Sequence, residues 1–285
     1  MLRSSSFAAA LPCLLALAVT ACSGSASVPP AVASADAAPL DPAHLVAASA
    51  VAADNDEARG EGYEYHIRYP ELDAKWDGLE HALRAFAAER KGEFLAHVAN
   101  ADETAGAPLA VLDLEFEVAR RTEDFLSVLA RGTAKVGIEN TPIVASFVMR
   151  LEDGKLLALG DLFGSADAAY KALSDECRRQ LEGRLEANLR QSVGDTPAVE
   201  PKLKEMRARV AQAAAPTADN LAVFLIDGLD SKAIGLTIVF PPDKLGDDAG
   251  EQQVEVPSKV FYSLLKPEYQ GAFQIDTEAL KPGVR

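Results

Sequence analysis

The four histidines are the side chains best suited to ligate a metal ion or to act as a general base near neutral pH. His81 and His97 fall in one predicted helix, but their spacing places them about 160° apart around its axis. His44 and His66 stand alone in the sequence. Because a zinc site needs three or four converging ligands, we predict no metal site.

The other reactive groups also lack a catalytic arrangement. The chain has no Gly-x-Ser-x-Gly turn and neither of the common glycine-rich phosphate-binding motifs. Asp113, Glu115 and Glu117 alternate with apolar residues, so we expect them on the solvated face of a strand, where desolvation does not raise a pKa. We therefore predict no catalytic residue, no cofactor and no enzymatic activity. The alternative is an envelope hydrolase acting on peptidoglycan or its substituents, with a site built from residues far apart in the sequence.

Aromatic residues are concentrated at Tyr63, Tyr65, Tyr69 and Trp76. Aromatic side chains at a strand edge can stack on sugars or anchor a protein partner. The same residues can instead close the core where the first predicted strand meets the first predicted helix. We favour the second interpretation.

Residues 1–21 have the composition of a bacterial export signal. Arg3 precedes an apolar run of about 13 residues, shorter than the roughly 20 that cross a bilayer as a helix. The stretch 17–22 resembles a lipobox, which predicts cleavage after Ala21 and a diacylglyceryl group on Cys22. An ordinary signal peptide cut near Ala21 is the alternative. Ser23 is not the Asp that signals inner-membrane retention, so we expect a lipid-anchored envelope protein, in the outer membrane and facing the periplasm.

The net charge of the chain limits the kinds of partner that it can bind. The whole sequence carries −15 at pH 7, and removal of residues 1–21 takes away Arg3 and no acidic residue. Such a chain is repelled by nucleic acid, so we predict no nucleic-acid binding. The charge suits a cationic protein partner, although acidic side chains often only solvate helix faces.

Cysteine usage excludes a disulfide within the predicted mature chain. Cys13 leaves with the signal and Cys22 is lipidated, so Cys177 remains alone. Cys177 is in phase with Leu173 and Leu181 at helical spacing, which indicates a buried apolar position rather than a nucleophile.

The elements that must position any site follow from hydrophobic periodicity. Residues 22–60 are rich in Ala, Ser, Pro and Val without sustained periodicity and read as a flexible tether. Strand patterns occur at 63–69, 112–118, 125–131, 143–151, 156–157, 221–226, 234–240 and 254–256. Helix patterns occur at 76–100, 165–192 and 199–214, and Pro257 is predicted to open a last helix at its first position. The order predicts an α+β fold in which helices cover one face of a mainly antiparallel sheet. We expect two intimately associated halves, 61–164 and 165–266, followed by a tail over 267–285.

Four stretches resemble a known family. Residues 65–83 and 125–128, and then 151–163 (LEDGKLLALGDLF), resemble the domain that precedes the catalytic module of PdaC-type peptidoglycan deacetylases. Residues 224–265 are similar to the C-terminal domain of unknown function of RsiV-type anti-sigma factors. Residues 131–141 contain no histidine, whereas relatives tend to carry a Gly-Gly-Ala-His type turn there.

The resemblance implies a non-catalytic envelope domain, because neither a deacetylase module nor a transmembrane signalling segment accompanies it here. RsiV's recognition of lysozyme suggests a cationic, lysozyme-like protein as one partner; a glycan such as peptidoglycan is another. We therefore expect a lipid-anchored binding protein, with binding residues that the sequence does not identify.

Overall fold

The structure is a computed structural model that describes residues 55–100, 109–194, 196–197, 199–229, 231–246 and 249–275. The predicted export signal, Cys22, His44 and most of the predicted tether lie outside the described residues. The described residues belong to one compact unit, Ala47–Arg285. None of their helices is both long and apolar enough to cross a membrane.

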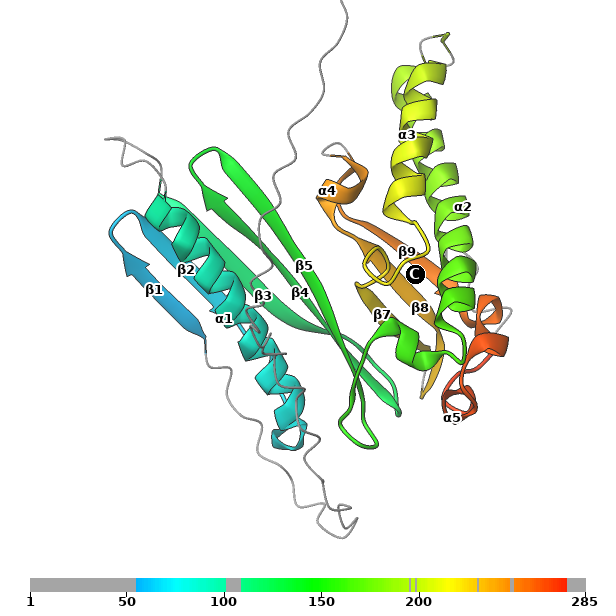
Figure 1. The fold of residues 1–285 in the computed structure, drawn as a ribbon, viewed down its shortest axis with the longest axis horizontal. Coiled ribbons are helices and arrows are strands. Elements are labelled where there is room, and N and C mark those ends of the chain that lie inside the picture. The colour runs from blue at the N-terminus through cyan, green and yellow to red at the C-terminus, as the bar shows by residue number, and fades with distance from the viewer. Residues whose placement is uncertain are drawn as a thin grey trace, which may run out of the picture. The chain divides into compact units, whose positions relative to one another are not determined.

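The N-terminal part is a six-stranded sheet with one helix on it (Figure 1). Its strands lie in chain order, and all neighbours are antiparallel except the parallel pair β2 and β3, which the helix α1 connects. The elements are β1 (Asp56–Gly60), β2 (Tyr63–Arg68), α1 (Asp77–Asn100), β3 (Ala110–Arg121), β4 (Phe125–Val136), β5 (Glu139–Arg150) and β6 (Leu156–Leu157). The prediction of a mainly antiparallel sheet in an α+β fold is confirmed.

The alternation of side chains in β3 decides which face of this sheet is buried. Leu112, Leu114 and Phe116 are buried with residues of α1, while the carboxylates between them are exposed. On α1 the buried residues recur at helical spacing, as in Leu79 and Leu83. The six-stranded sheet therefore has one apolar face under α1 and one polar face, which we call the outer face.

The C-terminal part is a three-stranded antiparallel sheet packed against two helices. Its elements are α2 (Ala166–Val193), α3 (Val199–Ala213), β7 (Phe224–Leu229), β8 (Lys232–Phe240), α4 (Pro242–Leu245), β9 (Gln252–Pro257) and α5 (Pro267–Gln270). Ser165 caps the start of α2 by accepting a hydrogen bond from the backbone N–H of Ala168. Strand β7 begins three residues later than predicted, whereas α2 and α3 match the predicted helices closely.

The two sheets meet where β7 contacts β3, β4 and β5. The backbone N–H groups of Phe224 and Ile226 donate to the hydroxyl oxygens of Ser146 and Ser127, at 2.9 and 3.1 Å. These serines supply acceptors that a neighbouring strand would otherwise supply. The close association of the two halves thus combines these hydrogen bonds with a shared apolar cluster, in which Phe125 and Val148 pack with residues of the C-terminal part.

Three expectations about the ends of the domain were wrong. Residues 56–60, placed in the tether, form β1, an edge strand whose mostly exposed side chains leave no apolar alternation to detect. Pro257 does not open a helix but ends β9, and two 3-10 turns follow because Phe261 inserts between Phe163 and Phe273. The predicted tail begins with core residues, because Tyr269 and Phe273 are buried.

Asp227 lies at the junction of the sheets and gives the fold a pH dependence. Desolvation raises its pKa, against hydrogen bonds from Thr237 Oγ1 at 2.6 Å and Arg120 Nε at 3.1 Å. A carboxylate whose pKa is higher in the folded state lowers stability as pH rises from its ordinary value of 3.8 through the folded value. We expect the stability advantage of the wild type over Asp227→Asn to shrink across that window, as measured by urea unfolding at successive pH values. An advantage independent of pH would contradict this.

Candidate functional site

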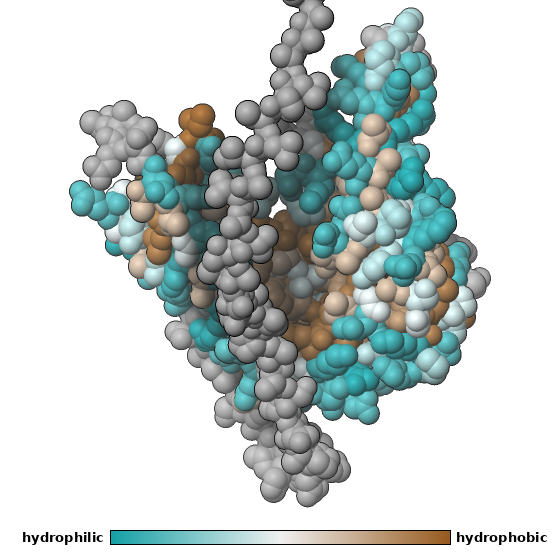
Figure 2. All heavy atoms as spheres, in the orientation of Figure 1, coloured by the Kyte–Doolittle hydropathy of each residue, from teal (hydrophilic) through white to brown (hydrophobic). Residues whose placement is uncertain are grey.

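A groove of about 370 Å³ lies on the outer face of the six-stranded sheet, and we call it the polar groove. Its floor comes from β2, β3, β4 and β5, and its rim includes two residues of the C-terminal part. The lining residues are Arg68, Asp113, Leu114, Glu115, Arg131, Gly132, Thr133, Pro142, Ile143, Val144, Pro242 and Glu251. Figure 2 shows that hydrophilic side chains cover much of α2 and α3.

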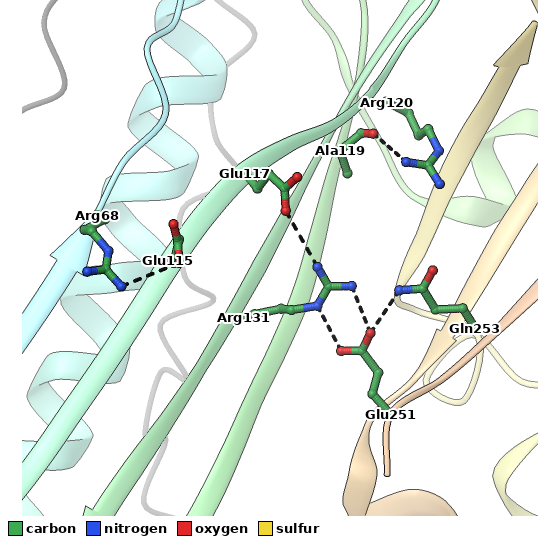
Figure 3. A network of polar contacts seen from close by, with 8 residues as sticks. All are labelled: Arg68, Glu115, Glu117, Ala119, Arg120, Arg131, Glu251 and Gln253. Atoms are coloured by element: carbon green, nitrogen blue, oxygen red, sulfur yellow. Dashed lines mark hydrogen bonds and ion pairs between the residues drawn. The ribbon is translucent and has the colours of Figure 1, made fainter. Parts of the chain in front are cut away.

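Arg131 and Glu251 form a two-point ion pair across the polar groove (Figure 3). Arg131 Nε and Nη2 donate to the two carboxylate oxygens of Glu251, at 3.0 and 2.9 Å. Desolvation opposes the ionisation of Glu251, but hydrogen bonds from Arg131 and Gln253 outweigh it and lower the pKa of that carboxyl. Glu251 therefore stays ionised at neutral pH, which suits charge recognition rather than proton donation.

Carboxylates outnumber guanidinium groups along the polar groove. Arg68 pairs with Glu115 at 3.5 Å, and Arg131 also approaches Glu117 at 3.8 Å. The side chain of Asp113 forms no hydrogen bond or ion pair with any residue that the structure describes. The groove therefore presents net negative charge to a partner.

Gly132 allows the close approach of β3 and β4 beneath this charge. A Cβ atom on Gly132 would lie 2.1 Å from the carbonyl oxygen of Asp113 and 2.9 Å from Cα of Leu114. Real Cβ atoms do not approach that closely, so glycine is required by the strand spacing here.

The predicted site residues lie where their patterns placed them, with different consequences. The carboxylates of β3 are exposed as predicted, but the structure adds Arg68, Arg131 and Glu251, which no local pattern marked. His66 is 3.9 Å from Glu64, and His81 is exposed on α1. No group of three or more metal-ligating side chains occurs within the described ranges.

The aromatic residues at the start of the domain belong to the core beneath α1. Tyr63 packs edge-on against Phe94, with ring centres 6.3 Å apart, and Tyr69 stacks on Phe116 at 5.3 Å. Trp76 is buried, and the cations of Lys75 and Arg121 lie over its ring. The interpretation that these residues close the core is confirmed.

Cys177 is fully buried among apolar residues of α2 and the adjoining sheet. Burial raises the pKa of its thiol to about 12, so the thiolate is scarce at neutral pH. The prediction of an apolar core position is confirmed.

A second groove of about 260 Å³ lies between α1 and the β4–β5 hairpin, and we call it the apolar groove. Phe86, Phe94, Val136 and Ile143 line it, and charged residues of α1 and β5 line it as well. The latter are Arg90, Glu93, His97 and Glu139. Arg90 is already held by Glu89 at 3.0 Å and Glu93 at 2.8 Å, so this groove also has no surplus of positive charge.

Comparison with known proteins supports the fold. No protein-family model and no curated protein sequence matches the chain. The crystal structure of a DUF3298 family protein from Pseudomonas aeruginosa PAO1 is similar, with 12% sequence identity, a TM-score of 0.50, and coverage of 75% of this chain and 92% of that one. A DUF3298 family structure from Bacteroides fragilis NCTC 9343 has 16% identity, a TM-score of 0.47, and covers 77% of this chain and 94% of its own. The chain is thus structurally similar to DUF3298 family proteins over about three quarters of its length.

Proposed function

We propose that this chain is a lipid-anchored binding protein of the bacterial cell envelope that captures a cationic protein without catalysing a reaction. The anchor is the diacylglyceryl group on Cys22, on an outer membrane and facing the periplasm. Within the DUF3298-like fold, the first half corresponds to the PdaC-type domain and the second half to the RsiV-type domain.

The acidity of the polar groove is the observation that supports this proposal. Asp113, Glu115 and Glu251 line it against Arg68 and Arg131, and each arginine is already paired with a carboxylate. A basic side chain entering the groove gains the unpaired Asp113 without displacing an existing ion pair. The lysozyme recognition of RsiV-type proteins makes a lysozyme-like protein the first partner to test.

A binding titration against ionic strength tests the proposal. We expect the full chain, purified in detergent with its anchor, to bind lysozyme at low salt, with an affinity that falls steadily as salt rises. Cytochrome c serves as a cationic control of unrelated shape and should bind more weakly at every salt concentration. Absence of lysozyme binding at low salt excludes this partner. Equal binding of lysozyme and cytochrome c would show that the interaction depends only on the positive charge of the partner.

A further inference from the structure

Strand β5 has an unpaired edge among the residues that the structure describes. On one side β5 pairs with β4 along its whole length, from Glu139 to Arg150. On the other side β6 pairs only with Val148 and Met149. The stretch 139–147 therefore presents backbone N–H and C=O groups that pair with no other described strand.

The two grooves lie on either side of this edge. Pro142, Ile143 and Val144 line both the polar groove and the apolar groove. The side chains of β5 alternate between the two faces of the sheet here. Ile143 belongs to the core under α1, whereas Val144 lies opposite Arg131 of β4 on the outer face. A strand added beside β5 would therefore direct its side chains alternately toward the two grooves.

The other sheet edges do not offer this arrangement. The β9 edge is covered by α2, since Gln180 and Arg184 donate to the backbone oxygens of Glu255 and Gln253. The β7 edge donates to Ser127 and Ser146. Strand β1 is a short charged edge that lines neither groove.

The grooves differ in the side chains that they suit. The apolar groove presents Phe86, Phe94 and Val136 to a side chain pointing toward α1. The polar groove presents Asp113, Glu115 and Glu251 to a side chain pointing toward the outer face. An added strand that matches both has apolar and basic residues at alternating positions.

We propose that the cationic partner adds an extended segment to the open edge of β5, with apolar side chains toward α1 and basic side chains in the polar groove. This inference rests on the proposed function and names the partner segment that it would recognise. Backbone hydrogen bonds supply affinity in such strand addition, and the alternating pockets supply specificity. Pro142 lacks an N–H group, so at this residue the edge of β5 offers the partner only a carbonyl oxygen as a hydrogen-bond acceptor.

Synthetic peptides test the proposal on the unaltered full chain. The probe is a seven-residue peptide in which Lys and Val alternate, labelled with a fluorophore and titrated by anisotropy. A control peptide has the same composition with the Lys residues in one block. Two further peptides carry backbone N-methyl groups on all Val or on all Lys residues. Because successive N–H groups of a strand point to opposite edges, each methylated peptide loses hydrogen bonding on one edge only.

The expected result is tighter binding of the alternating peptide than of the block peptide. One methylated peptide should bind at least about tenfold more weakly, and the other should match the parent peptide. Equal binding of both methylated peptides and the parent, or no binding of the alternating peptide, overturns the strand addition. Binding of the block peptide and its salt dependence report on the acidic capture separately, so failure of the strand addition is distinguishable from failure of the proposed function.

Discussion

We expect the triple variant D113N/E115Q/E117Q to bind lysozyme about tenfold more weakly than the wild type at low ionic strength. All three carboxylates are exposed on the outer face; Asp113 and Glu115 line the polar groove, and Glu117 lies 3.8 Å from its Arg131. An exposed ion pair contributes about 0.2–1 kcal/mol, so three together approach the roughly 1.4 kcal/mol that corresponds to a factor of ten. The measurement is a Kd titration at low and high salt, and the difference between variant and wild type should fade as salt rises.

A matched control separates the groove from the overall charge. Glu152, Asp219 and Glu268 are exposed carboxylates that form no ion pair with another described residue, and none of them lines the polar groove. Their neutralisation changes the net charge by the same amount, yet we expect less than a twofold effect on Kd. Equal losses in both triple variants would show that net charge, and not the polar groove, attracts the partner.

Truncation of Phe261 to Ala should cause the largest loss of stability in the second half. Phe261 is 0% exposed, and its ring meets Phe163 at 5.8 Å and Phe273 at 5.6 Å, both edge-on. Truncating a buried phenylalanine costs about 3–5 kcal/mol, through lost burial and the cavity that remains. That is a large fraction of the roughly 5–15 kcal/mol that stabilises a typical domain. Urea unfolding followed by circular dichroism measures the loss.

Ile138→Ala is the corresponding control for an exposed position. Ile138 is fully exposed between β4 and β5, beside Gly137 in the turn. Its truncation should change the free energy of unfolding by less than about 0.5 kcal/mol. If Phe261→Ala is as mild, the aromatic contacts around residue 261 do not hold the C-terminal segment in place.

The parts of the fold that were predictable are those with strong local periodicity. The alternation around Leu112 and Leu114 marks β3, and the helical spacing of Leu173, Cys177 and Leu181 marks α2. The segment after Pro257 differs from the predicted helix because long-range packing of Phe261 overrides a local helix signal. The strand β1 was missed because backbone pairing to β2 holds it, with little apolar burial.

The candidate site was predictable only in part, for a related reason. The exposed carboxylates of β3 follow from alternation within one strand. Arg131 and Glu251 are 120 positions apart, and only the meeting of β4 with the segment before β9 brings them together. Likewise the open edge of β5 depends on how little of it β6 covers. Properties of this kind arise from strand order, which local periodicity does not contain.

The two serine hydroxyls that accept hydrogen bonds from β7 also affect where the structure opens first. Ser127 and Ser146 satisfy two peptide N–H groups with a single oxygen each, without the continuous ladder that links strands inside a sheet. The apolar cluster of the C-terminal part also includes Phe125, Val148 and Leu157 of the six-stranded sheet, so apolar burial contributes more to this seam than backbone pairing does. Because a single hydroxyl oxygen holds each of them, we expect the amide protons of Phe224 and Ile226 to exchange before those in the centre of either sheet.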